Sequence, residues 1–104
     1  MTLAVSTLTT TANTIYFSTG NSAITSLTLC NYSPGNVTAN LYVVPNSESP
    51  DTTNIMLSTI LITSGDTYQI YNAAEKLLLG PGDSICANAS ANTTITAITS
   101  YTPL

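Results

Sequence analysis

The chain has 104 residues with a net charge of −4, and it combines a single lysine with no arginine and no histidine. A chain of this length forms one domain with one hydrophobic core. One lysine argues against nucleic-acid binding, which needs several Lys or Arg contacts to phosphate, and against binding to anionic membranes. No apolar run approaches the roughly 18 residues of a membrane span.

Neutral polar residues take the place of the missing charges. Thr, Ser and Asn supply 42 residues, and charged residues make up 6% of the chain, against a usual fraction of roughly 25%. The richness in β-branched residues argues against disorder. The sequence therefore predicts a neutral surface with weak repulsion between copies. Such a surface suits dense assembly, and an uncharged secreted domain is the alternative.

The first eleven residues are small, Thr-rich and uncharged. We divide the chain into an N-terminal arm, residues 1–11, and a β-sandwich domain, residues 12–104. The arm is either a frayed terminus or a strand added to the sheet edge of a neighbouring molecule. No signal peptide is predicted, because the start has neither a basic region nor a sustained apolar one.

From residue 14 onward the side chains alternate with period two, and turn residues recur every 8–12 positions. This pattern predicts about eight short strands, over residues 14–17, 22–31, 37–43, 55–63, 67–71, 77–79, 84–89 and 93–101. Residues 72–76 have the composition of a single helical turn, too short to be stable alone. The expected fold is all-β, a single antiparallel β-sandwich of jelly-roll type.

Alternation also assigns side chains to strand faces. In residues 22–31 it separates one set from a second, namely Ala23, Leu27 and Leu29 from Ile24 and Cys30. In residues 55–63 both faces are apolar, with Ile55, Leu57 and Leu61 on one and Met56, Ile60 and Ile62 on the other. We expect that strand to be covered on both sides, by the second sheet and by a neighbouring subunit. The polar loop 45–54 is expected to be mobile or to contact a partner.

The sequence predicts no catalytic residue, no cofactor and no metal site. The carboxylate pairs Glu48 with Asp51 and Asp66 with Asp83 lie in predicted loops or turns, where solvated carboxylates are more common than glycosidase pairs. Asp66 and Asp83 both follow a glycine, which favours hairpin turns over calcium ligands. Lys76 beside Glu75 forms either an exposed ion pair of small value or the anchor of an interface salt bridge.

The cysteines and tyrosines are the other residues with distinctive chemistry. Cys30 and Cys86 are expected to be two small buried thiols, with one disulfide as the alternative. Tyrosine is enriched at interfaces and carbohydrate-facing surfaces. The chain has six that either contact a partner or pack on strand faces: Tyr16, Tyr32, Tyr42, Tyr68, Tyr71 and Tyr101.

Four phrases carry a family resemblance: Thr-Ile-Tyr at 14–16, the strand 23–31 ending in Cys-Asn, the Gly-Asp-Thr turn within 63–68, and Leu-Gly-Pro-Gly-Asp-Ser within 77–85. Together they resemble small virion structural proteins of tailed bacteriophages, particularly marine and cyanobacterial ones. The resemblance covers the chain from residue 14 onward. It implies a β-sandwich that assembles symmetrically, often as a trimer, on the head, tail or fibres of the particle. It carries over no catalytic residue.

These observations together favour a non-enzymatic virion component assembled in the host cytoplasm. The leading hypothesis is a capsid decoration or cement protein whose partners are the major capsid protein and further copies of the chain. The alternative is a tail, baseplate or fibre component with host-receptor or glycan contact. A cellular β-sandwich binding module and, last, an enzyme are the remaining classes.

Overall fold

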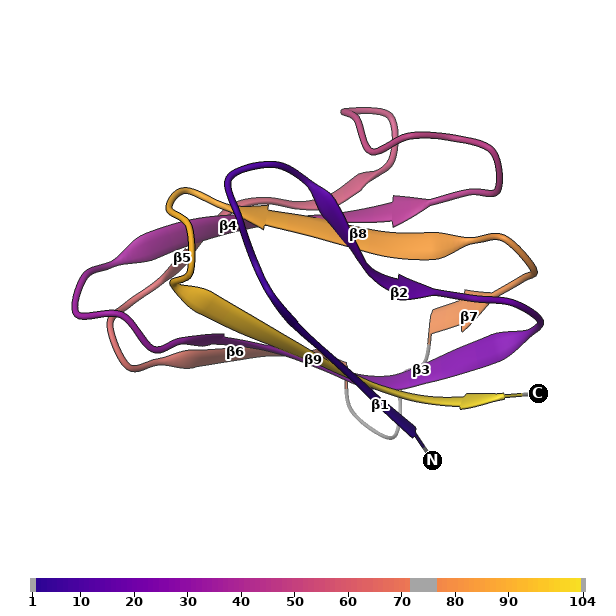
Figure 1. Cartoon of the computed structure of the whole chain (residues 1–104), viewed down its shortest axis with the longest axis horizontal. Coiled ribbons are helices and arrows are strands. Elements are labelled where there is room, and N and C mark those ends of the chain that lie inside the picture. The colour runs from indigo at the N-terminus through magenta and orange to yellow at the C-terminus, as the bar shows by residue number, and fades with distance from the viewer. Residues whose placement is uncertain (1, 72–76, 104) are drawn as a thin grey trace.

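The computed structural model describes residues 2–71 and 77–103, which form nine strands and no helix (Figure 1). None of these residues belongs to a helix that is long and apolar enough to cross a membrane. The helical turn predicted at 72–76 lies outside the described residues. The strands are β1 (Thr2–Thr7), β2 (Asn13–Phe17), β3 (Ser22–Asn31), β4 (Val37–Val44), β5 (Ile55–Ile62), β6 (Thr67–Tyr71), β7 (Leu77–Leu79), β8 (Ser84–Ala89) and β9 (Ile95–Pro103).

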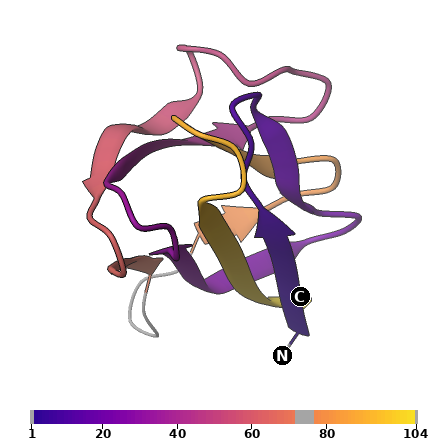
Figure 2. The same ribbon diagram turned by 60° about the vertical axis from the view of Figure 1, so that its left-hand side comes forward.

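Two antiparallel sheets pack face to face, which confirms the predicted β-sandwich (Figure 2). The first sheet has the order β1-β9-β3-β6, with β7 also paired to β3, and the second has the order β2-β8-β4-β5. The ribbon β3–β4 runs beside β9–β8 from one sheet into the other, as in a jelly roll. The nested pairing stops there, because β5 stays beside β4 and β6 returns to β3.

The core lies between the sheets and is mainly aliphatic. Both sheets contribute side chains that are almost wholly buried, among them Ile24, Leu27, Leu29, Leu41, Ile85, Ala87, Ile95 and Ala97. Each buried Leu or Ile contributes about 1.5–3 kcal/mol relative to an exposed one. The period-two alternation predicted for residues 37–43 places Val37, Ala39 and Leu41 in this core.

The N-terminal segment is neither of the two alternatives that the sequence left open. Residues 2–7 form β1, which pairs in unbroken antiparallel register with β9 of the same chain, from Thr2 opposite Tyr101 to Thr7 opposite Thr96. Beyond it, Leu8 enters the core, and its amide donates to the carbonyl of Ile95 at 2.9 Å. The arm therefore completes the chain's own sheet.

A bulge in β5 overturns the predicted assignment of its faces. Two steps along β4 correspond to three along β5 between the pairs Ala39–Ile60 and Leu41–Leu57. Thr59 takes up the extra residue with a φ of 54°, and its amide donates to Oδ1 of Asn40 at 2.7 Å. Because an extra residue reverses the alternation, Leu57, Ile60 and Ile62 face the core, and Met56 and Leu61 face outward. A second register shift separates Leu57 from Ile55.

A second irregularity corrects the predicted faces of β3. The register with β9 shifts between Ile24 and Ser26. The shift brings Ile24 into the core with Leu27 and Leu29, whereas Cys30 stays half-buried on the outer side. Alternation misassigned Ile24 because it assumes an unbroken strand.

Candidate functional site

Three of the described carboxylates, those of Asp51, Asp66 and Asp83, support loops or turns. Asp83 closes the turn after β7, where its two oxygens accept the amides of Gly80 at 2.9 Å and Asn46 at 3.0 Å. Asp66 sits in the turn before β6, where it accepts the hydroxyl of Thr63. The two Gly-Asp sequences therefore form turns as predicted, but the prediction that these are hairpin turns is wrong, because each joins strands of different sheets, β5 to β6 and β7 to β8. Glu75 and Lys76 lie outside the described residues.

Glu48 and Asp51 are exposed in the loop that the sequence placed at 45–54. The side chain and the backbone amide of Thr53 both donate to Asp51, and these bonds lower the pKa of its carboxyl below the ordinary value of 3.8. Asp51 therefore stabilises the loop's own turn as an anion. In the part of the chain that the structure describes, no three His, Cys, Asp or Glu side chains are grouped to hold a metal ion.

Both cysteines are free thiols. Cys86 is buried in the second sheet, with its sulfur 3.6 Å from Oγ1 of Thr14. Cys30 is only half-buried in the first sheet. The prediction of a buried thiol is therefore confirmed for Cys86 and is wrong for Cys30.

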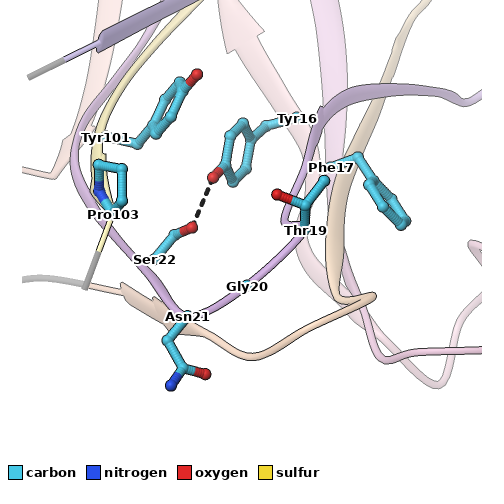
Figure 3. A pocket seen from close by; sticks show the side chains of 8 residues that line it. All are labelled: Tyr16, Phe17, Thr19, Gly20, Asn21, Ser22, Tyr101 and Pro103. Carbon is cyan, nitrogen blue, oxygen red and sulfur yellow. Dashed lines mark hydrogen bonds between the residues drawn. The ribbon is translucent and has the colours of Figure 1, made fainter.

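The candidate site is a pocket of about 420 Å³ where the end of β2, the turn after it and the start of β3 meet the end of β9 (Figure 3). Its lining residues are Tyr16, Phe17, Thr19, Gly20, Asn21, Ser22, Tyr101 and Pro103. Figure 3 shows Tyr16, Tyr101 and Pro103 around the hollow, while the ring of Phe17 points away from it. The volume lies within the range of small-molecule sites.

The two tyrosines come from different sheets and form the rigid wall of this pocket. Their ring centroids are 4.4 Å apart with planes tilted by 42°, a geometry that contributes about 0.5–1.5 kcal/mol beyond area burial. Tyr16 is largely buried, and its hydroxyl donates to Oγ of Ser22 at 2.7 Å. Tyr101 is half-buried, so part of its surface remains accessible.

A hydroxyl network fixes the floor of the pocket. Oγ of Ser22 lies 2.9 Å from Oγ of Ser18, which is fully buried and donates to the carbonyl of Gly20. The backbone of Ser18 is held in turn by the amide of Gly82 and the carbonyl of Asp83. The pocket thus rests on the Asp83 turn and is preorganised.

The lining has aromatic surface, hydroxyls and an amide, and its residues include no Asp, Glu, Lys, Arg or His. It offers no cationic side chain to a phosphate or a carboxylate group. A neutral ligand with an apolar face and polar edges, such as a pyranose, matches this chemistry. The pocket holds no arrangement of nucleophile and base.

Sequence reasoning named Tyr16 and Tyr101 within a set of six tyrosines but did not bring them together. The remaining described tyrosines are dispersed, with Tyr32 and Tyr68 exposed and Tyr42 half-buried. Ser18, Ser22 and Pro103 were missed, because nothing local marks small polar residues at strand ends as pocket residues.

Comparisons with protein-family models, with curated proteins and with solved structures found no match to this chain.

Proposed function

We propose that this chain is a non-enzymatic structural component of a tailed-bacteriophage virion, acting as a capsid decoration or cement protein. The observation that supports it best is an uncharged outer sheet face with exposed apolar side chains. The assignment to a virion rests on the resemblance of the sequence to small virion structural proteins of tailed bacteriophages. The partners are the major capsid protein and further copies of the chain.

This surface, which we call the neutral face, is the outer side of β1, β9 and β3 and consists of Leu3, Val5, Thr28, Thr96, Ile98 and Ser100. Its positions alternate with the inward-facing Ala97 and Thr99, which are buried. Val5, Ile98 and Thr28 lie side by side across the three strands. Leu3 and Val5 are 64% and 63% exposed, values unusual for apolar strand residues in one cluster.

The distribution of charge supports docking through sheet faces. The described carboxylates, Glu48, Asp51, Asp66 and Asp83, all lie in loops or turns. Burying a charge without a partner costs several kcal/mol, whereas Thr and Ser hydroxyls find new partners across an interface. Cementing across capsid subunits would bury this neutral surface without that penalty.

Mass spectrometry of purified particles tests the proposal through copy number. A decoration protein is expected at a stoichiometry comparable to that of the major capsid protein. A handful of copies per particle would contradict decoration and favour the tail, and absence from particles would contradict a virion role. As a functional test, purified chain is added to particles that lack it, and the temperature of genome release is expected to rise.

The pocket favours a second candidate, a tail, baseplate or fibre component that contacts a glycan. Chemical-shift titration of the isolated chain with neutral pyranoses is expected to move the signals of Tyr101 and Ser22. Tyr101→Ala is expected to abolish these shifts, while Tyr32→Ala, which changes an exposed tyrosine outside the pocket lining, leaves them. Shifts that survive Tyr101→Ala would rule out the pocket as the contact.

A further inference from the structure

β1 is the most regular of the strands at the sheet edges. The ends of the two sheets are β1 and β6 in the first and β2 and β5 in the second. The pairings of β2, β5 and β6 each contain a register shift, whereas β1 has six consecutive partners on β9 without one. β7, which also has no shift, is only three residues long.

Natural sheets protect their edges with charges, prolines, bulges or very short strands. β5 has its bulge at Thr59. β1 reads Thr-Leu-Ala-Val-Ser-Thr and has none of these features. Among the described residues, its free side therefore presents a straight row of backbone donors and acceptors that a further β-strand would satisfy.

We infer that β1 pairs with β1 of a second copy, antiparallel and across a two-fold axis, to continue the first sheet from one molecule into the next. An antiparallel edge is self-complementary under a two-fold axis, because each strand offers the other the same pattern of donors and acceptors. The contact uses a surface of the isolated chain and does not depend on the proposed virion role.

The side chains agree with an identical partner. In the pair, Leu3 and Val5 of both copies lie on the same side of the continuous sheet, next to Ile98 of each, and shield one another from water. No acidic or basic side chain lies on β1 or among the residues of the neutral face. Identical copies therefore meet there without like-charge repulsion. On the inner side, Ala4 and Ser6 are small enough to permit close approach.

The test is the mass of the isolated chain in solution, measured by light scattering or sedimentation. The wild type is expected at twice the chain mass of 10.8 kDa, and Val5→Lys at the monomer mass. Leu61→Lys is the matched control, because Leu61 is 60% exposed on the edge strand of the other sheet; it is expected to remain dimeric.

Amide hydrogen exchange gives an independent readout. In the dimer all β1 amides are expected to be protected from exchange. Val5→Lys is expected to restore fast exchange to the β1 amides that face away from β9. The β3 amides are expected to stay protected in this variant, and their protection shows that the fold is intact. A wild type that stays monomeric up to about 1 mM overturns the inference, because a weaker contact would leave most copies unpaired. A trimer, which the family resemblance implies, overturns it too, as does a dimer that Val5→Lys leaves intact.

Discussion

Asn31 ties the end of β3 to the second sheet through its fully buried amide. Nδ2 donates to the carbonyls of Gly35 and Ile62 at 2.9 and 2.8 Å, and Oδ1 accepts the backbone amide and hydroxyl of Ser33 at 3.0 and 2.7 Å. All four hydrogen-bonding positions of the amide are filled. The strand end marked by Cys-Asn in the sequence is thus a junction between the sheets.

Asn31→Ala is expected to lower the free energy of unfolding by about 2–4 kcal/mol, because it leaves buried partners unsatisfied and opens a cavity. Urea unfolding measures the loss. Asn36→Ala is the control, because Asn36 is exposed and accepts one bond, from the amide of Ser64 at 3.1 Å; it should cost at most about 1 kcal/mol. Equal losses in the two variants would show that the amide network is not what stabilises the junction.

Asp51 gives a prediction of pH dependence at the same scale. The pKa of its carboxyl is lowered, first by the side chain of Thr53 and then by its backbone amide. The loop contact is therefore fully present above the unfolded pKa of about 3.8 and is lost as the pH falls through the lower folded pKa. Thr53→Ala is expected to raise the pKa of Asp51 toward 3.8 in a carboxyl NMR titration. An unchanged pKa for Asp51 would contradict the assigned cause.

Among the connecting elements, the turn 80–83 supports both the pocket floor and the loop after β4. Gly82 has a φ of 84°, and a Cβ placed there would lie 2.4 Å from Cγ of Asn46. Gly65 in the turn before β6 has a similar φ of 78° and no atom within 4 Å of such a Cβ. Comparing an alanine substitution at Gly65 with one at Gly82 therefore distinguishes the cost of backbone strain from the cost of steric overlap.

Gly65→Ala is expected to cost about 1–2 kcal/mol from backbone strain alone, and Gly82→Ala about 1 kcal/mol more, because the exposed Asn46 side chain must leave its position. Thermal unfolding of the two variants measures the difference. Adding Asn46→Ala to Gly82→Ala removes Cγ and should recover most of the extra loss. A double variant no more stable than Gly82→Ala would contradict the proposed overlap.

The strands from β2 onward and the turns between them were predictable because their signals are local. The alternation within residues 37–43 spans only a few positions, and so does each of the two Gly-Asp turns. The bulges at Thr59 and near Ser26 were not, because an extra residue becomes visible only when a strand is laid against its partner. For that reason alternation placed Ile24 on the face opposite Leu27 and Leu29, although all three lie in the core. It also placed Leu61 on the face of Leu57, although Ile60 and Ile62 are the residues that share this face.

At the scale of the whole molecule, the features that could not be predicted from the sequence depend on contacts between distant segments. The pocket needs residues 16–22 beside residues 101–103, and the place of β1 needs its register with β9. Neither pairing leaves a trace in composition or period. The neutral surface, in contrast, was foreseen from composition, and the fold places the described charges in loops away from the sheet faces.

That separation of charge from the sheet faces predicts that self-association through β1 is insensitive to salt. Raising NaCl from about 50 to 500 mM shortens the Debye length from roughly 14 to 4 Å, so contacts between charges weaken while apolar burial and backbone pairing persist. The dimer dissociation constant from sedimentation is expected to change by less than about threefold.

A rise of tenfold or more in this dissociation constant would instead support the alternative from the sequence that Lys76 anchors an interface salt bridge. Lys76→Gln separates the two directly: it leaves the dimer intact if β1 forms the contact and weakens it at low salt if the salt bridge does.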